Sequence, residues 1–275
     1  MVSTDYQPML APRPSVPVGP PVEPFPALDF GAAAVNPKAH VAPGTGLRTA
    51  LAWIPMLAII VAVALPTMGV GLLIAAVSGW LLRKKIHARI KGSGVRVNAE
   101  QLPEIHKCVE AFARRLGMKA MPEVYIVEDA VQNGVAVKLG SNDIVMLTDD
   151  VIWGALHSGD ARALGYVIGH ELAHVALGHT GTLRSLQSNA FPSLSRLDEF
   201  TADNVAAALV NDRALAVKGI TLLTVGPQLV PHINMAAMEK QAKEVWADKQ
   251  SKKAEQGLTH PLLFRRIANV LGAKH

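Results

Sequence analysis

The stretch YVIGHELAHVALGHT, residues 166–180, places three histidines and one glutamate among mostly apolar residues. His170 and His174 are four residues apart, so on a helix they lie about 40° apart around the axis and one turn apart along it. Two imidazoles at this spacing can bind one zinc ion. Glu171 lies about 60° beyond His174, where its carboxylate can take a proton from a water on the metal without binding the metal itself. The pattern H-E-x-x-H therefore predicts a hydrolytic zinc site with Glu171 as the base.

The alternative is a core helix whose histidines bond to backbone carbonyls or other side chains. Polar and charged groups gathered on an apolar helix are costly to bury without a partner such as a metal, which favours the site. His179 does not fit the extended pattern H-E-x-x-H-x-x-G-x-x-H, because the chain has Leu177 and Thr180 where glycine and histidine are needed. On a continuing helix His179 would point away from His170, so we interpret it as structural or helix-terminal.

A third metal ligand is expected downstream, in SRLDEFTAD, residues 195–203. Glu199 and Asp203 are four residues apart on a strongly helical stretch, so they share a face. One could bind the metal while the other accepts the free N–H of a zinc-bound histidine. Asp198 points about 100° away from Glu199 and is expected to be solvated. An exposed acidic helix face is the alternative, and the upstream motif favours the site.

An apolar block without any charged residue runs from 49 to 82, longer than the roughly 18 residues that predict a membrane span. We favour one tilted span over a tight hairpin turning near residues 66–71, because two full crossings need roughly 40 residues. A basic cluster follows the block, which places the C-terminal part on the cytoplasmic side of the cell (inner) membrane. The same cluster explains most of the net charge of +5 and predicts contact with anionic lipids rather than with nucleic acid.

Residues 1–45 contain ten of the 18 prolines and predict a disordered or extended tail. Residues 99–275 form the expected enzymatic domain. Its lone Cys108 cannot form an internal disulfide and fits a reducing compartment. A helix is predicted from about 99 to 116, and three β-rich runs at 123–128, 133–139 and 143–148 predict a small antiparallel sheet of about three strands.

Helical patterns then dominate the domain. They cover 149–156, 160–179, 183–189, 195–211, 214–223, 236–256 and 262–271. The predicted fold class is α+β: a mostly helical zinc metallopeptidase domain with a small antiparallel sheet, preceded by a transmembrane segment and a disordered N-terminal tail.

Three motifs, GHELAHVALGH, SRLDEFTAD and THPLLFRRI, together resemble the membrane-anchored zinc endopeptidases related to HtpX and to the CAAX prenyl proteases. The resemblance runs from about Gln101 to Leu271. It implies a gluzincin fold that holds one Zn²⁺ per chain. The implied roles are metal ligation by His170, His174 and Glu199, general-base catalysis by Glu171, and support of a ligand by Asp203.

The resemblance also implies a substrate site on the strand before the zinc helix. An edge strand there could pair with the backbone of an extended peptide, with little demand on its sequence. The implied substrate-binding residues are Asn133, Gly134, Val135, Ala136 and, from the C-terminal motif, Arg266. Val135 stands where the family usually has an aromatic residue.

The C-terminal histidine of the family matches His260. The resemblance implies that His260 lies near the zinc and steadies the oxyanion of the reaction. From the residues alone, a histidine before Pro261 is extended or helix-capping, and a structural role remains open.

These features predict a membrane-anchored zinc-dependent endopeptidase that hydrolyses peptide bonds of membrane or misfolded proteins. Its expected partners are polypeptide substrates and membrane lipids, and its oligomeric state is open. One alternative is a membrane-anchored adaptor with a structural zinc site, and another is a zinc amidohydrolase acting on a non-protein amide. The carboxylate of Glu171 argues against the adaptor, because a structural zinc site has no use for an unligated base.

Overall fold

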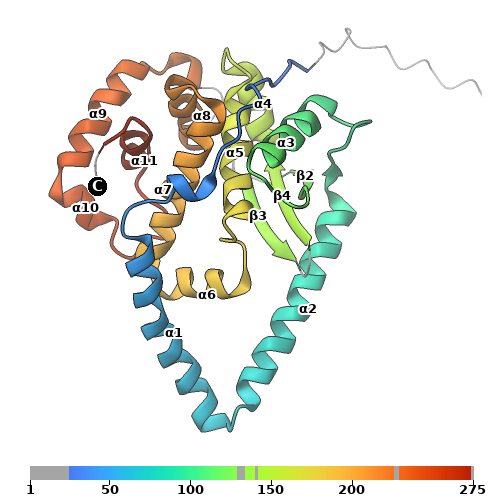
Figure 1. Cartoon of the computed structure of the whole chain (residues 1–275), viewed down its shortest axis with the longest axis vertical. Helices are drawn as coiled ribbons and strands as arrows, with labels where there is room; N and C mark the ends of the chain where they lie inside the picture. Colours follow the sequence, from blue (N-terminus) through green and yellow to red (C-terminus); the bar gives the residue numbers. More distant parts are fainter. Residues whose placement is uncertain (1–24, 129–133, 140–141, 226–228, 274–275) are drawn as a thin grey trace, which may run out of the picture.

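The computed structural model describes residues 25–128, 134–139, 142–225 and 229–273, which form a mostly helical domain above a helical hairpin (Figure 1). The strands are β1 (Val95–Arg96), β2 (Glu123–Val127), β3 (Gly134–Leu139) and β4 (Asn142–Thr148). The helices are η1 (Pro37–His40), α1 (Thr45–Thr67), α2 (Val70–Ser93), α3 (Pro103–Arg115), α4 (Asp149–His157), α5 (Ala163–Ala176), α6 (Thr182–Ala190), α7 (Pro192–Val210), α8 (Arg213–Val225), η2 (Val230–His232), α9 (Met235–Ala247), α10 (Lys249–Ala254) and α11 (Leu263–Val270). The predicted α+β class is confirmed.

The sheet has four strands in the order β1-β2-β4-β3. Strands β3 and β4 pair antiparallel, but β2 and β4 pair parallel, so the prediction of a purely antiparallel sheet is wrong. The chain leaves β2 and forms β3 on the far side of the position that β4 then fills, so β4 returns in the direction of β2. This order makes β3 an edge strand of the sheet.

Helix α5 lies at the centre of the domain and packs against α7, α8 and β3. Its residues from Ala163 to Ala173 are all buried. A helix that is apolar on nearly every side belongs in a core, and α5 is covered accordingly. Gly219 of α8 allows one of these contacts, because a Cβ there would lie 2.6 Å from the ring of Tyr166. The histidines of the H-E-x-x-H motif thus stand on the most enclosed helix of the fold.

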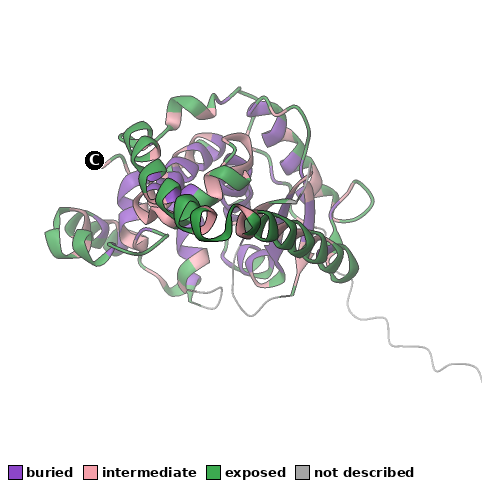
Figure 2. Cartoon of the chain, turned by 90° about the horizontal axis from the view of Figure 1, so that it is seen from below, coloured by how far each residue is buried: buried purple, intermediate pink, exposed green. Residues whose placement is uncertain are grey.

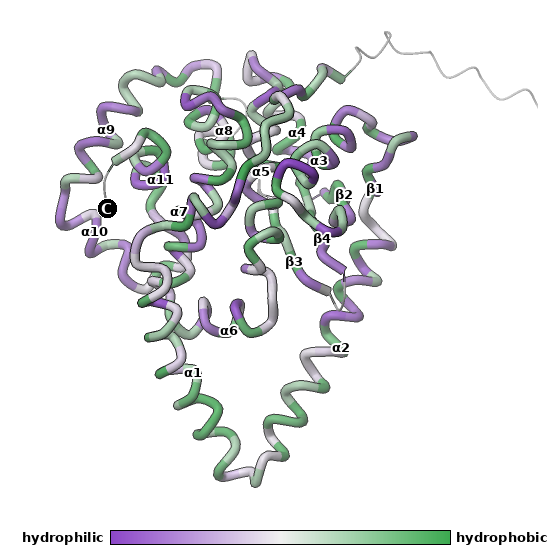
Figure 3. Tube along the Cα trace, in the orientation of Figure 1, coloured by the Kyte–Doolittle hydropathy of each residue, from purple (hydrophilic) through white to green (hydrophobic). Residues whose placement is uncertain are grey.

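Helices α1 and α2 form a V whose apex is the turn at Met68 and Gly69, both with positive φ. The apolar block predicted at 49–82 is therefore divided between two helices, which is the geometry of the hairpin alternative rather than of one continuous span. Helix α1 is long and apolar enough to cross a membrane. Apolar residues cover both legs near the apex (Figure 3), and most hairpin residues are exposed (Figure 2). The hairpin is an apolar extension of the domain, directed away from its core.

The segment 25–44, here called the N-terminal strap, packs on the domain. The prediction of a disordered tail over 1–45 is wrong for this part, and residues 1–24 lie outside the described ranges. Arg115 of α3 holds the strap by donating hydrogen bonds to the carbonyl oxygens of Ala33 (2.7 Å) and Phe30 (3.1 Å). The backbone N–H of Ala42 donates to Oγ1 of Thr201 in α7 at 2.9 Å. The strap buries three apolar side chains, Leu28, Val35 and Ala42.

Candidate metal centre

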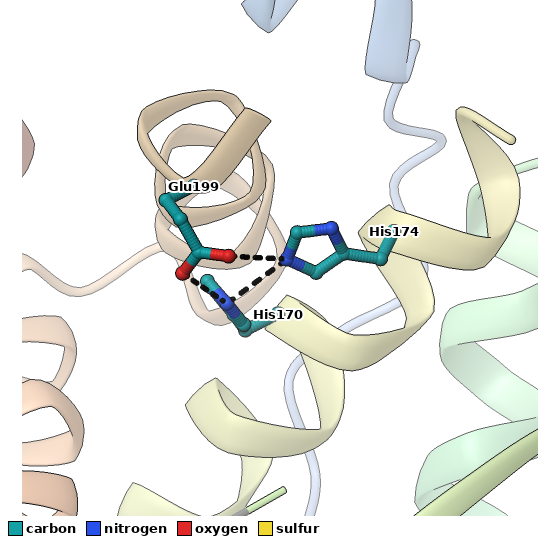
Figure 4. A group of neighbouring side chains, drawn as sticks. All are labelled: His170, His174 and Glu199. Atoms are coloured by element: carbon teal, nitrogen blue, oxygen red, sulfur yellow. Dashed lines mark hydrogen bonds and ion pairs between the residues drawn. The ribbon is translucent and has the colours of Figure 1, made fainter. Parts of the chain in front are cut away.

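Two helices bring three potential metal ligands together (Figure 4). His170 and His174 come from α5, and Glu199 comes from α7. The two Nε2 atoms are 3.2 Å apart, and the Glu199 carboxylate lies 3.5 Å from His170 and 3.4 Å from His174. One potential ligand atom from each residue lies within 4.8 Å of the others. Two imidazoles and one carboxylate are a donor set of catalytic zinc sites, which keep a fourth position for water or substrate, so these residues fit zinc.

Asp203 orients His170 from behind. Its fully buried carboxylate lies 2.9 Å from Nδ1 of His170 and accepts a hydrogen bond of 2.7 Å from the hydroxyl of Tyr166. Burial favours the neutral acid, but the charge of Arg266 outweighs it and lowers the pKa of Asp203 to about 2. An ionised Asp203 can accept the Nδ1–H of His170, which leaves the Nε2 lone pair free for a metal. Asp203 therefore has the geometry expected of a support for this ligand.

Arg266 lies against Asp203. Its Nε and Nη2 donate to the two carboxylate oxygens of Asp203 at 2.9 and 2.7 Å, and its Nη1 is 4.0 Å from Glu199. The sequence assigned Arg266 to substrate binding, whereas these contacts hold the acidic helix. Tyr166 was missed, although Tyr166, His170 and His174 follow each other at four-residue intervals and so share one face of the helix.

His260 is exposed and stands just before α11, with Nδ1 at 3.3 Å from the carboxylate of Glu199. The hydrogen bond to Glu199 raises the pKa of His260. Its loop is anchored by the buried Glu255, which accepts the backbone N–H of Leu262 at 2.9 Å and pairs with Arg265 at 2.9 Å. His260 is thus positioned at the rim of the metal centre.

Glu171 is buried between α5 and the edge strand β3. It accepts a hydrogen bond from the backbone N–H of Ala136, and burial raises its pKa to about 7. Gly134 makes this approach possible, because a Cβ at that position would lie 2.9 Å from Oε1 of Glu171. A carboxyl group with a pKa near neutrality can take up and release a proton under cellular conditions.

We expect Gly134→Ala to lower any hydrolytic activity by up to about 100-fold, because the added methyl group must displace the Glu171 carboxylate. Metal content should not change, since Gly134 contacts none of the three potential ligands in the available distances. Gly79→Ala is the control: Gly79 lines the same cavity, but a Cβ there meets no atom within 4 Å. Steady-state cleavage rates and bound metal are measured for both variants, and equal rates would contradict the expectation.

The site opens into a cavity of about 780 Å³. Its lining includes the three potential ligands, Glu171 and the strand residues Gly134, Val135 and Ala136. One wall comes from the hairpin, through Gly79, Leu82, Arg83 and Ile86 of α2. Asn133 lies outside the described residues. The cavity therefore joins the metal centre, the edge strand and the base of the hairpin.

His179 is placed differently from the expectation. Helix α5 ends at Ala176, and Gly178, with φ of 74°, turns the chain so that His179 folds back over His174. The rings meet at 3.1 Å between their Nδ1 atoms. Asp198 was expected to be solvated, but it is 4% exposed, because α6 covers it and supplies Arg184 as an ion-pair partner. Neither position follows from spacing along one continuous helix.

Comparisons with known proteins give one family match. Residues 99–191 match the model described as peptidase family M48. No curated protein and no solved structure matched the chain. The match contains His170, Glu171 and His174, while Glu199 and Asp203 lie beyond it and are joined to the motif by the geometry described above. Through residues 99–191, which carry the H-E-x-x-H helix, the chain is a member of peptidase family M48, a family of hydrolases that cleave peptide bonds.

Proposed function

We propose that the chain is a membrane-anchored zinc-dependent endopeptidase. The observation that carries the proposal is the buried Glu171 carboxylate, which lies between the cluster of His170, His174 and Glu199 and the edge strand β3. When bound, zinc supplies a Lewis acid and lowers the pKa of a water ligand to about 7. The two histidines and Glu199 would hold it.

Glu171 is the proton carrier of the proposed reaction. Its carboxylate takes the proton from the attacking water and delivers it to the nitrogen of the leaving amine. A burial-raised pKa of about 7 supports both steps, because the group is neither too weak a base nor too weak an acid. His260, at the rim of the site, is available to donate to the developing oxyanion of the scissile carbonyl.

The edge strand β3 supports a polypeptide as the substrate. An extended peptide can add to such an edge through its backbone, beside Gly134, Val135 and Ala136. The cavity beside β3 shares a wall with the hairpin, at Leu82 and Ile86 of α2. We infer that the enzyme cleaves membrane or misfolded proteins close to the bilayer.

The hairpin of α1 and α2 is the proposed anchor in the cell membrane. Its apex is apolar and exposed, and the leg that returns to the domain carries basic residues. Basic residues next to a membrane segment favour the cytoplasmic side and attract anionic headgroups. The proposed orientation therefore has the catalytic domain in the cytoplasm; the basic positions on this leg are Arg83, Lys84, Lys85, Arg89 and Lys91.

The test of this function is metal dependence. The purified full chain is expected to contain about one zinc ion per molecule. Removing the ion with a chelator should abolish cleavage of a denatured protein substrate, and added zinc should restore it. His174→Ala should lose both zinc and cleavage, whereas His232→Ala, an exposed histidine of η2, should keep both. A zinc-loaded wild type that cleaves no protein or peptide would refute the proposal.

A further inference from the structure

We propose that His179, Asp198 and Arg184 form a positioning relay that connects His174 to Thr49 of the hairpin helix α1. The inference rests on the proposed function, because it assigns these residues the task of holding one ligand of the zinc site. They are positioning residues: their contacts run to each other and to the back of His174, on the side away from Glu199.

The first link joins the two histidine rings. Nδ1 of His179 lies 3.1 Å from Nδ1 of His174, with the rings edge to face at 69°. Burial and the nearby His174 and Arg184 lower the pKa of His179 to about 2, so its ring is neutral and one of the two nitrogens is an acceptor. When Nε2 of His174 faces a metal, its Nδ1 carries the hydrogen and donates it to Nδ1 of His179.

The second link joins His179 to the acidic helix α7. With Nδ1 as acceptor, the hydrogen of His179 is on Nε2, which lies 3.5 Å from Oδ1 of Asp198. Asp198 is in turn held by Nε of Arg184 at 3.0 Å and by the hydroxyl of Ser188 at 3.1 Å. The two zinc-site histidines thus have comparable supports, since Asp203 contacts His170 directly and Asp198 reaches His174 through His179.

The third link leaves the catalytic domain. Nη1 of Arg184, on α6, donates to Oγ1 of Thr49 in α1 at 2.6 Å. Helix α6 also contacts the other leg of the hairpin, because Nη1 of Arg83 in α2 donates to Oγ1 of Thr182 at 2.7 Å. Figure 1 shows α6 lying between the two legs. A displacement of α1 would therefore move Arg184 and, through Asp198 and His179, the ring of His174.

A purely structural role for the same contacts makes a different prediction. In that case the Arg184–Asp198 pair only fastens α6 to α7, and its loss lowers the melting temperature of the metal-free protein without changing zinc affinity. In a positioning role, the loss weakens zinc binding beyond any change in the melting temperature, because His174 is no longer held in the geometry that the metal requires.

The experiment measures zinc affinity of the full chain in lipid vesicles by competition with a chromophoric chelator, together with the melting temperature of the metal-free protein. His179→Phe keeps a ring but removes the acceptor, Asp198→Asn removes the charge, and Thr49→Val removes the outermost hydrogen bond. We expect a loss of about 10- to 100-fold in zinc affinity for the first two, as for other residues that support metal ligands. Thr49→Val should show a smaller loss in the same direction, with an unchanged melting temperature.

Thr182→Val is the matched control, because it removes an equivalent arginine-to-threonine bond from the same helix without touching Asp198. Wild-type zinc affinity in folded His179→Phe or Asp198→Asn overturns the relay, and so does an equal loss in Thr182→Val and Thr49→Val. If His179→Phe does not fold, Asp198→Asn and Thr49→Val decide the question. A wild type that binds no zinc refutes the proposed function itself, which separates the two failures.

Discussion

Glu171→Gln is expected to lower peptide cleavage by about 10²- to 10⁴-fold while zinc stays bound. The amide has nearly the shape of the carboxylate, so it can occupy the pocket beside Gly134. It cannot take a proton from water at neutral pH, and the burial that raises the pKa of Glu171 to about 7 then serves no purpose. Bound zinc and cleavage of a denatured protein substrate are measured on the same preparation.

Glu199→Gln separates the role of a base from that of a ligand. It replaces the one carboxylate of the three potential ligands, so zinc affinity and cleavage should fall together. Loss of zinc in Glu171→Gln would show that Glu171 belongs to the metal-binding set, contrary to its assignment as the base. Retention of full cleavage would exclude it from proton transfer.

Asp203→Ala is expected to destabilise the fold by about 3–5 kcal/mol, because it leaves the charge of Arg266 buried without its partner. Asp203 is fully buried and contacts three groups: the guanidinium of Arg266, the hydroxyl of Tyr166 and the imidazole of His170. All three lose a partner at once. For a domain of this size the melting temperature should fall by roughly 10 °C.

Asp160→Ala is the comparison for this effect. Asp160 also pairs with an arginine, Arg162, but both side chains are partly exposed. Loss of an exposed pair costs at most about 1 kcal/mol. Thermal unfolding of the two variants beside the wild type measures the difference, and equal melting temperatures would mean that the Asp203 cluster adds nothing to stability.

The parts of the site that could be predicted are those that depend on position along one helix. The four-residue spacing of His170 and His174, and of Glu199 and Asp203, determines which side chains share a face wherever the helices pack. The structure brings the expected ligands together from α5 and α7. The mostly helical class also follows from local periodicity, and it is confirmed.

The parts that could not be predicted depend on where an element ends or on contacts between distant segments. The direction of His179 changed because α5 stops at Ala176 and the chain turns at Gly178. The surroundings of Asp198 depend on α6, which supplies Arg184. The parallel pairing of β2 and β4 depends on the strand order, to which the local β-rich runs give no guide.

The N-terminal strap has a consequence for the sidedness of the membrane. The strap precedes α1, and its partner Thr201 in α7 follows α2, yet the two are joined by the hydrogen bond from Ala42. Chain on both sides of the hairpin therefore lies on the same face of any bilayer that the hairpin enters. The number of complete crossings by α1 and α2 together must be even.

The length of the second leg narrows this further. The uncharged part of α2, residues 70–82, extends about 20 Å at 1.5 Å per residue. The hydrocarbon core of a bilayer is about 30 Å thick. An even count combined with so short a leg favours zero complete crossings: the hairpin enters from one face, turns at Met68 and Gly69 within the acyl chains, and emerges on the face it came from.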